Sequence, residues 1–324
     1  MPLKIHLLSP CETGNIDGPV FHILRQLPQE NRCDSLEQAD VIMVPITHFD
    51  WFRYNEDTMN KVRGKKWVLV DYSEFGWDWD QETSYNWGST MLNCPKFGQN
   101  EHYQKFDQFI RENPPILTFQ RELLQKDRTD KLIPIEYTSH LQEFGADTKD
   151  QFLKRPLEVS YYWGRSSEDR VRVQAEIFNL AAKKGFDVLT QFNFVEPAIK
   201  DNPNSKKWLA VFAPHYARLD VNEVQVIVRK SKATIVMPGC GVKTFRHGES
   251  CGDSIMVESH NNLAWSYPWT ASQNCLEMSH LDSFDELKED WLYDIYTAAM
   301  DNARNYRIDT YLRRWVVGNI ERCL

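Results

Sequence analysis

The chain has 324 residues, 42% hydrophobic and 26% charged, which is typical of a globular protein with room for two domains. Its net charge of −8 and isoelectric point near 5.6 disfavour nucleic acid as a partner, although a local basic groove stays open. No apolar run is long enough to span a membrane, and the N-terminus lacks the apolar region of a signal peptide. Seven scattered cysteines without a C-x-x-C pair indicate neither a disulfide framework nor a zinc site. We expect a reduced protein in the cytoplasm, or in the host cytoplasm if its source is a virus.

The first half of the chain alternates short apolar strands with short helices, which is the pattern of a β/α domain. The periodicity predicts strands at 3–8, 39–45 and 66–72 and helices at 21–27, 103–112 and 119–126. The second of these strands is continuously apolar, as expected for a parallel strand covered on both faces. We therefore expect residues 1–150 to form an N-terminal β/α domain.

The second half repeats this alternation after a stretch, 127–156, that we expect to contain the domain linker. The patterns predict strands at 159–163, 186–190, 233–237 and 254–257 and helices at 169–184 and 222–230. Gly185 is expected to stop the first of these helices, because glycine readily adopts the left-handed conformation that ends many helices. We expect a C-terminal domain over residues 151–300.

Two further helices are predicted near the C-terminus. Ser283–Glu286 reads as a capping box that opens a helix with Leu287, Trp291, Ile295 and Ala299 on one face. A last helix carries Ile308, Tyr311, Trp315 and Val316 at helical spacing. We expect the segment 301–324 to pack back on the N-terminal domain.

The loop after the 233–237 strand combines the residue types of an anion-binding site. Gly239 lets the backbone approach a ligand closely, and Arg246 can make a bidentate contact with a phosphate. Glu249 is suited to accept hydrogen bonds from ribose hydroxyls, and Glu258 competes with it for that role. The bland alternative for Arg246 and Glu249 is a structural ion pair. The combination predicts a nucleotide-sugar site at the carboxyl edge of a parallel sheet.

The turn after the 159–163 strand offers a second anion-binding feature. Gly164 and Arg165 end this strand, and Ser166 or Ser167 is the N-cap of the following helix. A helix N-terminus attracts anions through its free amide groups and its dipole. The functional interpretation is a pyrophosphate site that includes Arg165; the alternative is a routine turn with an exposed arginine.

Polar residues also follow strand ends in the first half. His48 and Asp50 come after the second predicted strand, and Asp71 lies at the end of the third. One of them is a candidate general base for an acceptor hydroxyl, and the alternative for each is a solvated loop side chain. Asp78 and Asp80 form a D-x-D triplet like the metal motif of some sugar transferases, but such triplets arise often by chance, so we expect no metal ion.

Several motifs occur in the order found in one family. Residues 39–45 resemble an "ADxFFVP" strand, and Tyr161–Arg165 followed by Arg170 resembles an "FFxG…R" entry to a donor domain. The segment from Ser231 through Pro238-Gly239, Arg246-x-x-Glu249 and 252–257 resembles "SKFCLxPxG…RxxExxxxGCIPV". With these motifs the chain resembles the exostosin family of glycosyltransferases over both of its halves.

The resemblance implies an α/β chain with GT-B architecture, in which two Rossmann-like parallel-sheet domains face a cleft. It implies a nucleotide diphosphate sugar as donor, no separate cofactor, and inversion at the anomeric carbon. By position, Arg246 and Glu249 take the family's donor-binding roles. Together with the features above, the expected donor-binding residues are Gly164, Arg165, Arg170, Pro238, Gly239, Arg246, Glu249 and Glu258.

The chain also departs from the family pattern. Cys240-Gly241 replaces the usual residues after the Pro-Gly pair, and Asp253-Ser254 replaces the usual Cys-Ile. The membrane anchor of the Golgi members is not found, which suggests a bacterial or viral relative with a different acceptor.

The expected function is that of a hexosyl- or pentosyltransferase that acts without a metal on the hydroxyl of a glycan or a similar acceptor. Two alternatives stay open. The first is a sugar transferase acting on hydroxymethylated bases of viral DNA, which the acidic isoelectric point disfavours. The second is a non-catalytic nucleotide- or carbohydrate-binding protein of the same fold.

Overall fold

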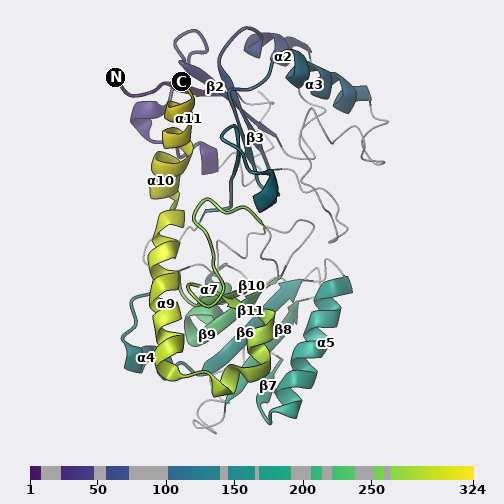
Figure 1. The fold of residues 1–324 in the computed structure, drawn as a ribbon, viewed down its shortest axis with the longest axis vertical. Coiled ribbons are helices and arrows are strands. Elements are labelled where there is room, and N and C mark those ends of the chain that lie inside the picture. Colours follow the sequence, from purple (N-terminus) through teal and green to yellow (C-terminus); the bar gives the residue numbers. More distant parts are fainter. Residues whose placement is uncertain are drawn as a thin grey trace. The chain divides into compact units, whose positions relative to one another are not determined.

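A computed structural model gives the fold of the chain (Figure 1). It describes residues 1–8, 23–46, 56–72, 101–138, 145–164, 168–190, 206–213, 221–237, 252–258 and 263–324, with the backbone alone at 56–58, 101–103, 163–164, 168–171, 211–213 and 221. The chain divides into two units by its contacts. Unit 1 comprises Met1–Thr138, Asn262–Ser266 and Ile308–Leu324, and unit 2 comprises Ser139–Asn261 and Tyr267–Arg307.

Unit 1 is built on a five-stranded parallel sheet with the order β1-β2-β3-β4-β5. Its strands are β1 (Ile5–Leu7), β2 (Val41–Ile46), β3 (Trp67–Asp71), β4 (Leu117–Gln120) and β5 (Leu132–Pro134). All six residues of β2 are buried, which explains its continuous apolar run. Helices α2 (Glu56–Val62) and α3 (Glu101–Glu112) pack on the sheet, where Phe109 contacts Trp67 with ring centroids 6.0 Å apart. The strands predicted at 3–8, 39–45 and 66–72 and the helix predicted at 103–112 are confirmed.

The helix predicted at 119–126 is wrong. Residues 117–120 form β4, and Gln125–Asp127 form one short 3-10 turn, like the turn at Gln29–Asn31. All four residues of β4 are buried, and β4 pairs with β3 and β5. The helical periodicity of these residues is weak, and their hydrogen bonds to two neighbouring strands decide the conformation instead. Whether a residue is stable in a strand depends mainly on such packing and burial, and less on its local sequence.

Unit 2 contains a six-stranded parallel sheet with the order β11-β10-β9-β6-β8-β7. The strands are β6 (Leu157–Gly164), β7 (Asp187–Leu189), β8 (Lys207–Ala213), β9 (Ser231–Val236), β10 (Ile255–Glu258) and β11 (Leu276–Glu277). The four strands predicted in this half are confirmed within a few residues. Three hydroxyls cross the sheet in its interior: Thr234 of β9 lies 2.9 Å from Ser160 and 2.8 Å from Ser254, oxygen to oxygen. The buried hydroxyl of Ser254 thus has a hydrogen-bond partner inside the sheet.

Helices cover both faces of this sheet (Figure 1). Helix α5 (Glu168–Lys183) and helix α9 (Glu289–Ala303) share one hydrophobic cluster with the strands, and α7 (Val221–Lys230) packs in a second cluster. Gly185 follows α5 with φ of +70°, a left-handed conformation that ends the helix as predicted. In the described part of the chain, no helix has both the length and the apolar composition needed to cross a membrane.

The capping box predicted at Ser283–Glu286 is wrong. These residues lie inside a 3-10 segment, Met278–Glu286, and Ser283 has non-helical dihedrals. Helix α9 begins after Lys288, whose side chain makes no capping hydrogen bond. A capping box is instead present at α4 (Lys149–Leu153), where Thr148 and Gln151 bond each other's backbone amides. The four-residue motif is too short to locate a helix start without the surrounding chain.

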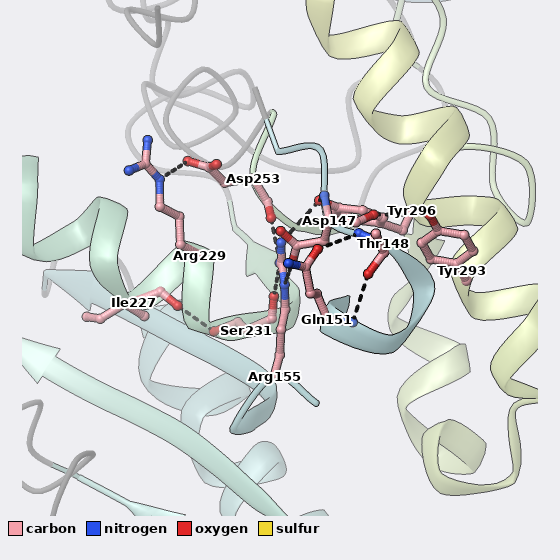
Figure 2. Close-up of polar contacts among 10 residues, drawn as sticks. All are labelled: Asp147, Thr148, Gln151, Arg155, Ile227, Arg229, Ser231, Asp253, Tyr293 and Tyr296. Carbon is pink, nitrogen blue, oxygen red and sulfur yellow. Dashed lines mark hydrogen bonds and ion pairs between the residues drawn. The ribbon is translucent and has the colours of Figure 1, made fainter. Parts of the chain in front are cut away.

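Arg155 holds together the amino-terminal edge of the unit 2 sheet (Figure 2). It lies between α4 and β6, and its guanidinium donates hydrogen bonds to Asp147 Oδ2 (2.9 Å), Ser231 O (2.6 Å), Asp253 O (2.5 Å) and the Tyr296 hydroxyl (3.2 Å). Its Cζ also lies 4.9 Å from the Tyr296 ring centroid. The side chain therefore connects the starts of β6, β9 and β10 to α9.

The last segment of the chain belongs to unit 1. It consists of α10 (Ile308–Tyr311), a π-helix (Leu312–Val317) and α11 (Gly318–Cys323), after a 3-10 turn at Arg304–Tyr306. The Tyr311 hydroxyl donates to Glu136 Oε2 (2.8 Å) and accepts from the Glu136 amide (3.1 Å). Ser266 donates its amide to Glu136 Oε1 (3.1 Å), and Trp315 Nε1 donates to Pro134 O (2.8 Å). This buried network attaches the segment to the end of β5.

Candidate functional site

The carboxyl ends of β6 and β9 mark the place in unit 2 where a ligand is expected. From β6 the chain adds β7 and β8 on one side of the sheet, and β9, β10 and β11 on the other. The strand order therefore reverses between β6 and β9, which are paired with Tyr161 opposite Ile235. Open parallel sheets bind ligands outside the carboxyl ends of the strands at such a reversal.

Three predicted donor-binding residues are described at or next to this edge. Gly164 is the last residue of β6, and Glu258 is the last residue of β10, with a relative exposure of 2%. Arg170 is the third residue of α5, the helix that follows β6. The first turn of α5 presents free amide groups and the positive end of the helix dipole, which favour an anion near the end of β6.

The other predicted donor-binding residues fall outside the described residues: Arg165, Pro238, Gly239, Arg246 and Glu249. In the sequence, Arg165 directly follows β6, and the other four lie between β9 and β10. They therefore follow the two strands between which the order reverses. Their donor-binding roles stay predictions.

Two glutamates flank a buried thiol at the same edge. Glu258 of β10 is in register with Glu277 of the neighbouring strand β11. Cys275 has a relative exposure of 1%, and burial, together with the negative charges of Glu258 and Glu277, raises the pKa of its thiol to about 12. The thiol is therefore protonated at neutral pH and is not a nucleophile.

Unit 1 also has predicted site residues at the carboxyl edge of its sheet. Asp71 is the last residue of β3 and has a relative exposure of 2%. It is in register with Ile46, the last residue of β2, and with Gln120 of β4. His48 and Asp50 follow β2 in the sequence but lie outside the described residues. All three candidate bases therefore come at or after the ends of two adjacent strands.

A buried arginine next to Asp71 was missed in the sequence. Arg121 is fully buried directly after β4, and its backbone amide donates to Asp71 O (2.9 Å). Its Nε donates to Glu122 Oε1 (2.7 Å), and its Nη1 donates to the Tyr137 hydroxyl. Buried ion pairs contribute little net stability, so this cluster is a candidate for holding the strand ends around Asp71 in one arrangement. Its only sequence signal is an Arg-Glu pair directly after an apolar strand, and charged residues there are usually exposed.

A serine–histidine pair in unit 2 does not have the proton arrangement of a nucleophile and its base. Ser272 adopts a positive φ of 63°, and its Oγ lies 3.1 Å from His280 Nε2. However, His280 Nδ1 accepts a hydrogen bond from the Glu277 amide (3.0 Å), so Nε2 carries the proton of the neutral ring. Nε2 therefore donates to Ser272 and cannot take its proton. His280 instead forms a capping box with Glu277 at the start of the 3-10 segment Met278–Glu286.

The D-x-D triplet at Asp78–Asp80 lies outside the described residues. Within the described ranges, no three or more His, Cys, Asp or Glu side chains are grouped so that they could hold a metal ion. The expectation of a metal-free site stays a prediction.

Comparison with known proteins relates the chain to others through its fold. No protein-family model matches the sequence, and no curated protein sequence matches it significantly. Among similar solved structures is trehalose-6-phosphate from E. coli bound with UDP-2-fluoro glucose, with a TM-score of 0.50 at 6% identity over 86% of this chain and 72% of that chain. The OtsA apo structure matches with a TM-score of 0.45 at 8% identity over 86% of this chain and 72% of that chain. The α,α-trehalose 6-phosphate synthase from Burkholderia multivorans matches with a TM-score of 0.45 at 9% identity, over 87% and 70%.

These neighbours are GT-B glycosyltransferases. With two parallel sheets in one chain, the fold is α/β of the GT-B type, and the predicted fold class is confirmed. At this level of identity the likeness concerns the fold and not the activity.

Proposed function

We propose that this protein is a glycosyltransferase that moves a hexose or pentose from a nucleotide diphosphate sugar to an acceptor hydroxyl, with inversion and without a metal ion. The observation that carries the proposal is the reversal of strand order between β6 and β9. The segments with predicted donor-binding residues follow these two strands. The GT-B fold of the chain supports the same reading.

The donor is proposed to bind at the carboxyl edge of the unit 2 sheet. Arg165, Arg246 and the N-terminus of α5 hold its diphosphate, and Glu249 or Glu258 accepts hydrogen bonds from its ribose. Gly164 and Gly239 keep the backbone free of side chains where the ligand approaches. Glu258 is buried at the end of β10.

The reaction is proposed to be a direct displacement at the anomeric carbon. The acceptor oxygen bonds to that carbon on the face opposite the diphosphate, and the bond from the carbon to the β-phosphate oxygen breaks. The nucleoside diphosphate leaves with the electron pair, and the cationic groups stabilise its charge. His48, Asp50 or Asp71 takes the proton of the acceptor hydroxyl.

The acceptor is proposed to be a glycan or a similar hydroxyl compound, and the protein a distant relative of the exostosin family from a bacterium or virus, working in the cytoplasm. The order of its motifs supports the kinship, and the net charge of −8 favours an acceptor other than a nucleic acid. A shift of hydroxymethylated DNA in a gel at low salt would support the alternative acceptor instead.

Screening of the full chain by thermal shift against a panel of nucleotide sugars tests donor binding. Ligands that bind only the native state raise its melting temperature, so at least one donor should do so in a concentration-dependent way. The stabilising donor is then incubated with candidate acceptors in excess EDTA, and transfer is followed by chromatography. We expect transfer in EDTA.

Two outcomes would contradict parts of this proposal. Loss of transfer in EDTA with recovery in Mn²⁺ would refute the metal-free mechanism and point to Asp78 and Asp80. Donor binding without transfer or hydrolysis, with every acceptor tried, would favour a non-catalytic binding protein.

A further inference from the structure

A cavity of about 650 Å³ lies within unit 1. One wall is the loop that leads into the amino end of β5, and the other is formed by the π-helix and α11 of the C-terminal segment. Its polar and aromatic lining includes Arg128, Thr129, Asp130, Trp315, Asn319 and Arg322. Small-molecule sites commonly have volumes of about 300–1,000 Å³, so the cavity has the size for a metabolite rather than a polymer.

A chain of hydrogen bonds holds one wall of the cavity in place. Trp315 Nε1 donates to Pro134 O (2.8 Å), and this fixes the indole against the end of β5. Asn319 Nδ2 donates to Trp315 O (2.6 Å), and Arg322 Nη2 donates to Asn319 Oδ1 (2.6 Å). The Arg322 guanidinium is therefore oriented by a neutral side chain and keeps its full charge for a ligand.

A second guanidinium reaches the same cavity from the opposite wall. The Cζ atom of Arg128 lies 5.7 Å from the centre of the Trp315 ring, a cation–π contact that leaves the charge uncompensated. Among the described residues, no carboxylate lies within ion-pair distance of Arg128 or Arg322. The lining has these two positive side chains against one negative side chain, Asp130, in a chain whose net charge is −8. Two like charges in one cavity repel each other, and a bound anion relieves this repulsion.

We propose that this cavity is a binding site for a small phosphorylated metabolite. A phosphate monoester carries about −1.5 to −2 charges at pH 7 and three acceptor oxygens, which matches two guanidiniums better than a single carboxylate does. The phosphate occupies only part of the volume, and Gln125, Thr129 and Asn319 offer hydrogen bonds to a polar body. All of its lining residues belong to unit 1, whereas the donor site is proposed on residues of unit 2.

The proposal is tested on the full chain with sodium phosphate as the probe, measured by thermal shift against sodium chloride at equal ionic strength. We expect a saturable rise in the melting temperature with phosphate beyond that with chloride. Arg128→Gln and Arg322→Gln should each weaken the apparent phosphate affinity at least about tenfold, because each removes a charge-assisted contact. Both side chains are exposed, and the double variant should lose the phosphate effect.

Two matched variants distinguish this site from phosphate binding elsewhere on the chain. Arg314→Gln removes an exposed charge from the same helical segment outside the cavity, and Arg246→Ala alters the predicted donor loop; both should keep the phosphate effect. Glycerol 3-phosphate should bind at least as tightly as inorganic phosphate. The proposal is wrong if wild type shows no phosphate-specific shift, if the single arginine variants retain full affinity, if Arg246→Ala alone abolishes the effect, or if glycerol 3-phosphate binds more weakly.

Discussion

Asp253 is a carboxylate that the sheet of unit 2 buries just before β10, with a relative exposure of 3%. Burial raises the pKa of this carboxyl above its ordinary value, and the nearby guanidiniums of Arg229 and Arg155 only partly oppose the rise. Arg229 Nε lies 3.2 Å from Asp253 Oδ2, and the negative charge of Asp147 acts in the same direction as burial. At neutral pH the ionised form of Asp253 therefore reduces the stability of the folded state.

The sign of this effect gives a prediction for pH. A raised pKa means that the folded state binds the proton more tightly than the unfolded state does, so stability from Asp253 falls as pH rises from about 3.8 through the folded-state value. The free energy of unfolding is measured in urea for wild type and for Asp253→Asn. The difference between them should shift in favour of wild type as the pH is lowered from 7 to 4.

A matched control has the opposite sign. A hydrogen bond from Lys184 lowers the pKa of Asp285 below its ordinary value of 3.8, so the stability that Asp285 contributes is lost as the pH falls below about 3.8. Wild type should therefore lose stability relative to Asp285→Asn mainly below that pH, under the range in which the Asp253 pair changes. The account would be contradicted if the difference in free energy of unfolding between wild type and Asp253→Asn stayed constant with pH. It would also be contradicted if that difference changed in the same direction as the one between wild type and Asp285→Asn.

For single residues, the sequence predicts a structural role when that role depends only on neighbouring positions in the chain. Gly185 was predicted from glycine chemistry alone, and Gly164 and Glu258 were predicted to lie at strand ends. Arg155 was not recognised as a central residue, because its partners Ser231 and Asp253 are 76 and 98 positions away in the chain. Arg121 was missed for a similar reason, since its hydrogen-bond partner Tyr137 is 16 positions away in the chain.

Among the elements, strands were predicted well where burial on both faces produces an apolar run, as in β2 and β9. Prediction failed for β4, where four residues are too few to show a period, and at α9, whose first residues follow a 3-10 segment rather than a capping box. A short motif carries little information when tertiary contacts decide the outcome. The loops with His48 and Arg246 lie outside the described residues, so their site roles remain predictions.

The C-terminal segment has helical spacing that the sequence shows and long-range contacts that the sequence does not show. Its helical spacing was predicted, but the buried hydrogen bonds that hold it depend on Glu136 and Ser266, which lie 175 and 45 positions from Tyr311. The Tyr311 hydroxyl both donates to the Glu136 carboxylate and accepts from the Glu136 amide. Burial raises the pKa of this hydroxyl well above its ordinary value, so it remains a proton donor at all physiological pH values.

Tyr311→Phe should destabilise the protein by about 1–3 kcal/mol, because it keeps the ring but leaves the buried Glu136 amide without its acceptor. Urea unfolding of the full chain measures this loss. Tyr293→Phe is the control, since it removes one partly exposed hydrogen bond, to Asp147 O (3.0 Å), and should cost about 1 kcal/mol or less. Equal stability of Tyr311→Phe and wild type would show that the network does not hold the segment.

In the whole molecule, neither unit is a continuous stretch of chain. Unit 1 is completed by residues 262–266 and 308–324, which come after the strands β6–β10 of unit 2. Cutting the chain between the sheets would therefore remove part of unit 1, including Ser266 and Tyr311. Binding and activity should be measured on the full chain.

The central claim is that the edge of the unit 2 sheet where the strand order reverses binds the diphosphate of a nucleotide sugar. Calorimetric titration of the full chain with the nucleoside diphosphate of the stabilising donor tests it most directly. Arg246→Ala should abolish binding while its circular dichroism stays that of wild type, and Arg172→Ala, an exposed change on α5, should leave the affinity unchanged. Wild-type affinity in Arg246→Ala would contradict the account.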